Sequence, residues 1–354
     1  MASFTVVSNY LARRGDEQPD QPDAPFPVLG FSTFVITLIA FFVASGCIDY
    51  VYGKVVATLA AVEDPNPDVY VRIENDRDVE NPINDADLPP PKPITSSLRS
   101  TLAHLKSRAG RLSRFRGIRL YLLIVIAVNL IASPLAAITG SGLLGNALGQ
   151  FVAEIVVSNL RVGWIHLVIS EPSTKSLWSR IPAWRKTTMK IAPAAAIRAV
   201  ASQLATFIPL LVASGTSLMA DPTNIAPTVF VSGGLGLTAL YLVLYVLVQM
   251  PAEVTFIRVA ASMLPEDDEA IVPFDRSFGG KVTPEIVGGQ GKIGIVDAWR
   301  SFNWGSRMRF LNVVGRVFLL QIAVSLVFAL ALISQVFIFF GDRIQQSGSI
   351  EITM

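Results

Sequence analysis

Residues 120–153 read LYLLIVIAVNLIASPLAAITGSGLLGNALGQFVA and decide the fold class, because they contain no Asp, Glu, Lys or Arg. A membrane helix needs about 20 consecutive apolar residues, so this stretch is too long for one span. Residues that favour turns interrupt its middle: Pro134, Gly140, Gly142, Gly145 and Asn146. The stretch therefore predicts a hairpin of two membrane helices.

Four further stretches without a charged side chain extend this pattern: residues 24–48, 199–220, 222–252 and 317–341. The composition agrees, since 51% of the residues are hydrophobic and 16% are charged, whereas an ordinary soluble domain has about 25% charged residues. These observations exclude a soluble fold. The apolar runs are solid rather than alternating, which favours helices over a barrel. We predict an all-α, polytopic membrane helical bundle.

Six membrane spans fit these stretches: residues 28–48, 119–139, 147–169, 194–218, 227–250 and 317–340. Lys and Arg gather in three of the connecting segments: residues 49–118, 170–193 and 251–316. The other two connections, about 140–146 and 219–226, contain neither. Because basic residues in short loops stay in the cytoplasm, the three basic segments are predicted to be cytoplasmic. The two tails, residues 1–27 and 341–354, then lie on the opposite side.

The first cytoplasmic segment begins with an acidic part, residues 63–87, which is rich in Pro and Asn and is expected to be unfolded. Four prolines follow it: Pro89, Pro90, Pro91 and Pro93. This run is expected to be a stiff spacer or a docking site for a cytoplasmic protein with an aromatic groove.

Residues 99–119 are predicted to form a basic amphipathic helix at the cytoplasmic interface. Apolar residues recur there at helical spacing: Leu98, Leu102, Leu105, Ala109 and Leu112. Thr95, Ser96 or Ser97 is available as the N-terminal cap. Related segments with two tryptophans and basic residues occur at 178–190 and 299–316. Two interpretations stay open, contact with anionic lipid headgroups and a signal that only fixes the topology.

The basic residues expected to contact anionic headgroups share a position next to a predicted span: Lys106, Arg108, Arg111, Arg114, Arg116, Arg119, Arg185 and Lys186. This contact motivates the leading hypothesis, a non-enzymatic protein that organises the membrane or interacts with lipid.

The third predicted span carries a polar stripe, because Gln150, Glu154, Ser158 and Arg161 share one helical face. Charged groups are costly in lipid, so they should face the bundle interior and find partners. The candidate partners lie in other spans: Asn129, Arg198, Gln203, Gln249 and Gln321.

Two interpretations of this polar stripe remain. It lines the pathway of a transporter or channel, or its ion pairs fix helix packing. Pro134 and Pro209 fall at similar depths in two spans, as the broken helices of transporters do. The packing interpretation is favoured because neither proline lies in the charged span.

No motif in the sequence supports catalysis, a metal or a cofactor. Two histidines, His104 and His166, and the single Cys47 are too few for the usual zinc sites. His166 is interpreted as a residue of the membrane interface rather than a ligand. We therefore predict no catalytic residues, no cofactor, no metal and no nucleic-acid partner. An enzyme acting on lipid headgroups remains a third hypothesis.

Two stretches resemble a family of uncharacterised multi-pass membrane proteins of filamentous fungi: residues 169–182, with ISEP and WSRIP, and residues 271–302, with IVPFDR and DAWRSF. Some members of that family are labelled ubiquitin carrier or conjugating proteins. A thioester mechanism needs an accessible cysteine, and Cys47 lies in a predicted span. The resemblance thus implies a fungal integral membrane protein without a known active site. The choice between plasma membrane and endomembrane stays open.

Overall fold

The computed structural model describes residues 28–64, 93–140, 142–216, 227–283 and 287–351. Every named element of these residues is a helix, and an isolated antiparallel bridge joins Ser170 to Ala270. Five helical stretches are long and apolar enough to cross a membrane: Leu29–Val62, Ser113–Thr139, Trp184–Ser214, Val231–Ala261 and Trp304–Phe339. A bent pair of helices provides a sixth when it is counted as one span. The predicted all-α membrane bundle is confirmed.

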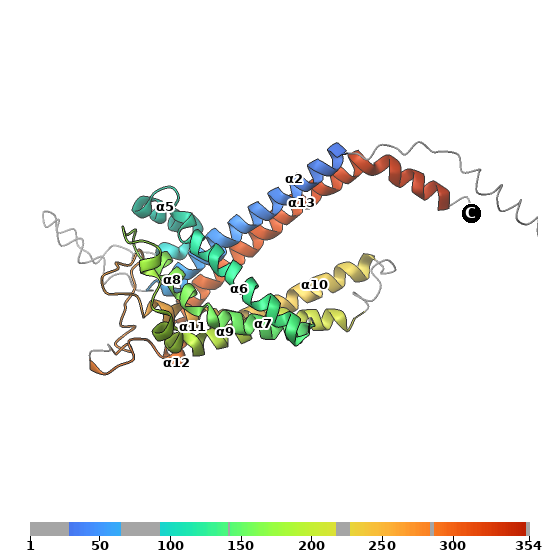
Figure 1. Ribbon diagram of the computed structural model, residues 1–354. Helices are drawn as coiled ribbons and strands as arrows, with labels where there is room; N and C mark the ends of the chain where they lie inside the picture. The colour runs from blue at the N-terminus through green and yellow to red at the C-terminus, as the bar shows by residue number, and fades with distance from the viewer. Residues whose placement is uncertain (1–27, 65–92, 141, 217–226, 284–286, 352–354) are drawn as a thin grey trace, which may run out of the picture. The chain divides into compact units, whose positions relative to one another are not determined.

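The chain divides into two compact units: residues 1–46 with 321–354, and residues 47–320. In the first unit, α2 (Val28–Ile48) lies beside the C-terminal part of α13 (Trp304–Glu351) (Figure 1). Ser45 Oγ donates to Gln321 Oε1 at 2.8 Å, and Gln321 Nε2 donates to Ser45 O at 3.0 Å. Gln321 is used in this pair, and not as the partner of Glu154 that the sequence had suggested.

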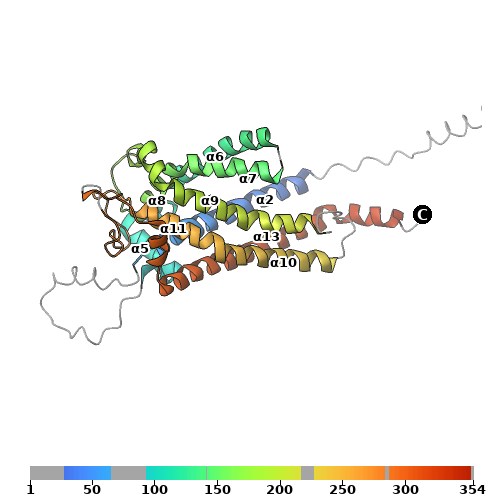
Figure 2. The same ribbon diagram turned by 90° about the horizontal axis from the view of Figure 1, so that it is seen from below.

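The predicted hairpin is present in the second unit as α6 (Ile118–Thr139) and α7 (Leu143–Val156), which lie side by side (Figures 1 and 2). One face of α6 is buried at every fourth position: Leu120, Ile124, Val128, Ala132 and Ala136. A Cβ at Gly149 would lie 2.5 Å from Ala132 O. Glycine is therefore required where the two backbones approach each other.

Neither Pro134 nor Pro209 breaks its helix, so the likeness of these positions to the broken helices of transporters does not hold. Pro134 lies inside α6 and Pro209 lies inside α9 (Trp184–Ser214), and both helices continue through them. Membrane helices tolerate proline when neighbouring groups satisfy the freed backbone. The chain turns instead at Gly140, whose φ of +92° ends α6.

The third predicted span, residues 147–169, corresponds to two helices with a bend between them. α7 ends at Val156, and α8 (Ser158–Ile169) leaves it at an angle of 58°. Val157 lies between the two helices, and its φ of −88° and ψ of 5° are outside the α-helical region. The bend lies within the polar stripe, where the sequence had shown no breaking residue.

Several helices extend beyond their predicted ends, because the helical pattern continues into the basic segments. The helix of the first span continues past residue 48, and that of the fifth continues past residue 250. The first span continues as η1 (Asp49–Val56) and α3 (Ala57–Val62). The fifth span consists of α10 (Pro227–Leu244) and η6 (Tyr245–Gln249) and continues as α11 (Met250–Ala261). Both η1 and η6 are π-helical. Likewise, α9 and α13 begin before the predicted starts at 194 and 317.

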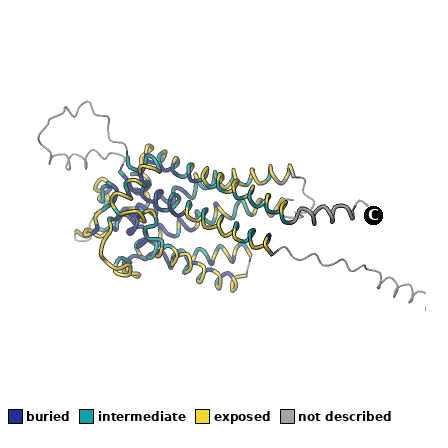
Figure 3. The backbone as a smooth tube through the Cα atoms, turned by 90° about the horizontal axis from the view of Figure 1, so that it is seen from above, coloured by how far each residue is buried: buried dark blue, intermediate teal, exposed yellow. Residues whose placement is uncertain are grey.

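The three predicted cytoplasmic segments pack together in the second unit, and its buried residues gather at one end (Figure 3). The short elements of this end are η3 (Ile94–Ser96), α5 (Leu98–Ala109), η4 (Ser113–Phe115), η5 (Trp178–Arg180) and α12 (Ile295–Arg300). Fully buried side chains from all three segments meet there: Leu59, Leu105, Ile191, Phe256, Ile293 and Phe302. These segments are therefore a folded core rather than separate loops.

Arg258 of α11 organises this core from a buried position. Its guanidinium donates to three oxygens at 3.0 Å each: Ala61 O, Ala298 O and Ser301 Oγ. The same group lies over the rings of Phe278 and Phe302, at 4.7 and 5.4 Å. A buried cation is tolerated when its donors are satisfied, so Arg258 joins α3, α11 and α12.

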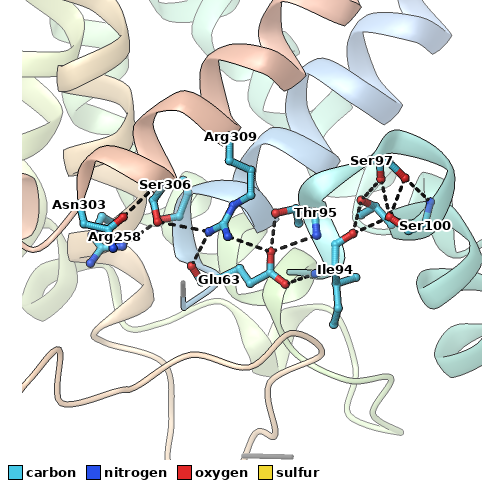
Figure 4. A network of polar contacts seen from close by, with 11 residues as sticks. Glu63, Ile94, Thr95, Ser97, Ser100, Arg258, Asn303, Ser306 and Arg309 are labelled. Carbon is cyan, nitrogen blue, oxygen red and sulfur yellow. Dashed lines mark hydrogen bonds and ion pairs between the residues drawn. The ribbon is translucent and has the colours of Figure 1, made fainter. Parts of the chain in front are cut away.

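Glu63 joins the two chain segments that flank residues 65–92 (Figure 4). Its carboxylate accepts hydrogen bonds from Ile94 N at 2.5 Å, from Thr95 N at 3.0 Å and from Thr95 Oγ1. Arg309 Nη1 lies 3.9 Å from the same carboxylate, and its Nη2 donates to Glu63 O at 2.9 Å. The rest of the acidic and proline-rich stretch, except Asp64 and Pro93, lies outside the described residues.

Candidate functional site

Four charged side chains from four helices form a network inside the second unit. Arg161 of α8 donates to both carboxylate oxygens of Glu154 in α7, Nε to Oε2 at 2.6 Å and Nη2 to Oε1 at 2.5 Å. Arg198 of α9 also donates to Glu154 Oε2, and its Nη1 lies 3.5 Å from Glu253 Oε2 of α11. Two cations and two carboxylates therefore balance one another.

The bend between α7 and α8 makes the bidentate contact possible. In a straight helix, residues seven apart are separated by about 10 Å along the axis, so Glu154 and Arg161 would meet there only through extended side chains or an intervening group. With the 58° bend at Val157, the guanidinium faces the carboxylate directly. The geometry is the forked pairing that makes Arg–carboxylate contacts strong.

Of the other predicted partners, Asn129 donates to Val125 O of its own helix at 2.8 Å, and Gln203 is half-buried with no recorded hydrogen bond to a described residue. Gln150, which begins the stripe, is also half-buried. Among the predicted partners, Arg198 is the one that the structure places against Glu154.

The side chain of His166 does not lie at the protein surface. It is buried in the core of the second unit, with Nε2 2.8 Å from Ala260 O. The described part of the chain holds no group of three or more His, Cys, Asp or Glu residues that could bind a metal ion. Cys47 is free and exposed.

The amphipathic helix α5 uses its apolar face to pack against the protein. Thr101 and Leu105 are 0% exposed, and His104 Nε2 lies 2.7 Å from Ile271 O. Ser97 caps its start by accepting a hydrogen bond from Ser100 N at 3.1 Å. The apolar face of α5, with Leu98, Leu102 and Leu105, therefore packs against the core.

The predicted continuation of this helix to residue 119 is wrong. α5 ends at Ala109, because Gly110 follows with a φ of +79°. After the short helix η4, Gly117 has a φ of +75° and begins α6. Leu112, the last residue of the predicted stripe, is 76% exposed in the turn between them.

The basic residues of this region divide by their surroundings. Exposed cations without an ion pair to any described residue are Lys106, Arg111, Arg114 and Arg119. Arg108 lies 3.5 Å from a Glu171 oxygen. Arg116 is turned toward the protein, with Nε donating to Leu167 O at 3.0 Å and Nη2 to Ser170 O. Arg116 therefore holds the turn in place through these two hydrogen bonds. Arg185 and Lys186, in the first turn of α9, are exposed.

Three of the exposed cations surround a pocket of about 260 Å³ between α5 and the turn that follows it. We call this the basic pocket, and its lining residues are Leu102, Lys106, Arg111, Ser113 and Arg114. No carboxylate is among these lining residues. The pocket lies beside the start of the membrane stretch Ser113–Thr139. Two guanidinium groups, an ammonium and a hydroxyl are donors suited to a phosphate, sulfate or carboxylate.

The wall of the basic pocket is fastened to the core behind it. Tyr50 Oη donates to Arg116 O at 2.6 Å, and Trp164 Nε1 donates to Tyr50 Oη at 3.2 Å. A Cβ at Gly117 would lie 3.1 Å from Trp164 Cδ1, so the turn is pressed against the indole. The lining residues between Gly110 and Gly117 are thus presented from a fixed backbone.

Sequence reasoning missed two contributors to these sites. Glu253 was assigned to a cytoplasmic segment, although the apolar pattern after Pro251 continues to Ala261 with only Glu253 and Arg258 interrupting it. Ser113 was overlooked because a lone serine in a basic stretch carries no pattern.

Comparison of the chain with protein-family models, with curated proteins and with solved structures gave no match.

Proposed function

We propose that this protein is a non-enzymatic membrane protein that interacts with anionic lipids through basic residues at the cytoplasmic end of its helices. One observation carries the proposal: the lining of the basic pocket combines Lys106, Arg111 and Arg114 with no carboxylate, beside the start of a membrane helix. Each basic residue near an anionic leaflet contributes about 1 kcal/mol of binding free energy.

The packing of α5 changes how this interaction is pictured. Because Leu105 is buried against the core, the apolar face is not available to insert into lipid. The cations are instead held on a folded surface, and the membrane helix α6 fixes that surface beside the bilayer. A peptide of residues 99–119 would expose the leucines artificially, so the full chain is the appropriate sample.

The test is extraction of the full chain in native-membrane nanodiscs, followed by mass spectrometry of the retained lipids relative to the bulk membrane. We expect anionic lipids to be enriched around the wild type. The double variant K106Q/R111Q is expected to lose most of this enrichment, because it removes two of the three cations of the pocket.

The matched control is R99Q/R300Q, which removes two exposed arginines that do not line the basic pocket. It has the same change in net charge and is expected to retain the wild-type lipids. Equal retention in the wild type and both variants would contradict the proposal, and so would equal losses in the two variants.

A second function, transport along the polar stripe, is supported by the break between α7 and α8. Transporter sites are commonly built at discontinuous helices, and this break lies between Glu154 and Arg161 in the chain. Ser158, at the start of α8, is 0% exposed, and its Oγ has no hydrogen-bond partner in the described structure. A buried polar atom without a protein partner is unusual, and this hydroxyl can donate to a polar solute in the stripe.

Ser158→Ala separates this second function from a purely structural network. The substitution removes the unpartnered hydroxyl and leaves all four charges in place. In proteoliposomes, transport along the stripe predicts that a solute or proton flux of the wild type is reduced in the variant at unchanged thermal stability. A wild type without flux, or an equal flux in both proteins, would count against it.

A further inference from the structure

We propose that the basic pocket binds a phosphomonoester group, presented by a phosphomonoester lipid of the adjoining leaflet. The inference rests on the proposed interaction with anionic lipids and deepens it by naming the headgroup class. It follows from the charge of the pocket, its size, its position and its fixed wall.

The charge of the lining matches a dianion better than a monoanion. Lys106, Arg111 and Arg114 supply three positive charges, and no carboxylate lines the pocket to offset them. A phosphate monoester carries a charge of about −1.5 to −2 near neutral pH and three acceptor oxygens. A phosphodiester has one negative charge and fewer free oxygens, so it would leave more of this positive charge uncompensated.

The geometry of the hydrogen-bond donors in the pocket also suits a terminal phosphate. The two guanidinium groups can each approach a pair of oxygens with two parallel N–H groups. Ser113 is 5% exposed as a residue and lines the pocket, so its hydroxyl can donate from the floor. A monoester presents enough oxygens for both forks and the hydroxyl together.

The size of the pocket suits a lipid headgroup. Its volume of about 260 Å³ is below the range of about 300–1,000 Å³ in which proteins enclose drug-sized ligands. The acyl chains of a lipid would therefore remain in the bilayer while its phosphate enters the pocket.

The position of the pocket favours a membrane lipid over free phosphate as the molecule that presents the phosphate group. Ser113 and Arg114 are the first two residues of the stretch Ser113–Thr139, which is apolar enough to cross the membrane. Leu112 is 76% exposed beside them. An exposed leucine next to a cationic pocket at a helix start is expected where the protein surface meets lipid.

The wall of the basic pocket is held in place by the core, so binding would cost less conformational entropy. Arg116 ties the turn to the carbonyls of Leu167 and Ser170, and Tyr50 donates to the backbone of Arg116. The neighbouring Arg111, Ser113 and Arg114 therefore project from a backbone that is already ordered. Such preorganisation raises affinity and selectivity.

The experiment reconstitutes the full chain into nanodiscs of phosphatidylcholine that contain equal small fractions of phosphatidic acid and phosphatidylserine. Mild detergent then strips the loosely held lipids, and native mass spectrometry counts those retained. Phosphatidic acid is the monoester probe and phosphatidylserine the diester probe. We expect retention of phosphatidic acid to exceed that of phosphatidylserine by about tenfold, as one additional charge-assisted hydrogen bond would give. In K106Q/R111Q the excess should disappear.

Conservative substitution distinguishes charge from geometry. R111K/R114K keeps all three positive charges but removes both guanidinium forks. This variant is expected to retain phosphatidylserine as the wild type does while losing most of the preference for phosphatidic acid. An undiminished preference would overturn the role assigned to the two arginines.

The remaining outcomes separate failure of this inference from failure of the proposed function. Equal retention of the two anionic lipids, lost together in K106Q/R111Q, would overturn the monoester and leave the anionic-lipid function standing. Enrichment of neither over phosphatidylcholine would overturn both. Preference for phosphatidic acid that K106Q/R111Q leaves intact would place the site elsewhere. If inorganic phosphate stabilises the protein in pure phosphatidylcholine as much as phosphatidic acid does, the lipid source is wrong.

Discussion

Glu154 is the residue on which the intramembrane network depends, because its two oxygens accept from both Arg161 and Arg198. Glu154→Gln would leave two guanidinium groups without their full counter-charge in a low-dielectric interior. Breaking a buried ion pair in this way costs about 3–5 kcal/mol. We expect a clear fall in thermal stability in detergent, measured by a fluorescence unfolding assay.

Glu253→Gln is the matched control for Glu154→Gln. Glu253 lies 3.5 Å from Arg198, and a third of its side chain is exposed, so its ion pair is weaker and better solvated. The expected loss is smaller than that of Glu154→Gln. Equal losses, or a Glu154→Gln protein as stable as the wild type, would show that the network does not hold the helices together.

Gly117 is the residue that fixes the turn below the basic pocket. Its φ of +75° disfavours any side chain by about 1–2 kcal/mol, and a Cβ would also press against Trp164 at 3.1 Å. Gly110 has a similar φ of +79°, but a Cβ added there would have no neighbouring atom within 4 Å. Gly117→Ala is thus expected to lower the unfolding temperature more than Gly110→Ala. Equal shifts would mean that the indole gives way without cost.

The sequence predicted part of these residue-level contacts. The helical spacing of Gln150, Glu154, Ser158 and Arg161 predicted that these polar residues share a face, since a period of 3.6 is visible along one segment. It could not show Glu253, because the approach of α11 to α9 is a tertiary contact. The bend at Val157 was equally hidden, because no Gly or Pro marks it.

At the scale of elements, α5 is held by its core contacts and not by lipid. Leu105 is fully buried whereas Leu112 is exposed, although both belong to the same predicted stripe. Leu105→Ala should reduce the free energy of unfolding by about 2–5 kcal/mol, as for other buried leucines. Leu112→Ala should leave it unchanged. The comparison uses denaturant titration in one detergent, and a stable Leu105→Ala protein would contradict the docking of α5.

A second element-scale contact connects the segment after α8 with the segment after α11. Lys175 Nζ donates to Asp267 and, at 3.1 Å, to Asp268. Glu171 N donates to Glu269 O at 2.8 Å beside them. The hydrogen bond from Lys175 lowers the pKa of the Asp267 carboxyl, and the bonds to both aspartates raise the pKa of the Lys175 ammonium.

These pKa directions define a pH window for the Lys175 contact. The lowered Asp267 pKa contributes stability above the usual carboxyl pKa, and this is lost as the pH falls through the lowered value. The raised Lys175 pKa contributes stability below the usual ammonium pKa, and this is lost as the pH rises through the raised value. From about pH 4 to 10 we expect the wild type to unfold at a slightly higher temperature than Lys175→Gln.

The Lys175 contact is exposed, so added salt should reduce that difference. Lys186→Gln, at an exposed lysine without an ion pair to any described residue, is the control and should show no such window. A Lys175→Gln difference that is constant from pH 2 to 12 would contradict the pairing.

At the scale of the molecule, the apolar runs predicted the helical membrane bundle. A segment that crosses the hydrocarbon core must satisfy its own backbone hydrogen bonds, so each long apolar run is expected to be a helix. The apolar runs did not predict the core that the three basic segments form together. Its contacts join residues far apart in the chain, such as Glu63 to Arg309 and Arg258 to Ala61. These pairings lie in stretches of mixed composition whose local pattern resembles that of loops. The basic pocket depends on this core for its fixed wall.

Lipid retention by the full chain in native-membrane nanodiscs tests the central claim most directly, with wild type, K106Q/R111Q and R99Q/R300Q measured side by side. The account predicts anionic lipid enriched on the wild type and on R99Q/R300Q, and lost from K106Q/R111Q. Retention that is the same in all three proteins, or that falls equally in both variants, would contradict it.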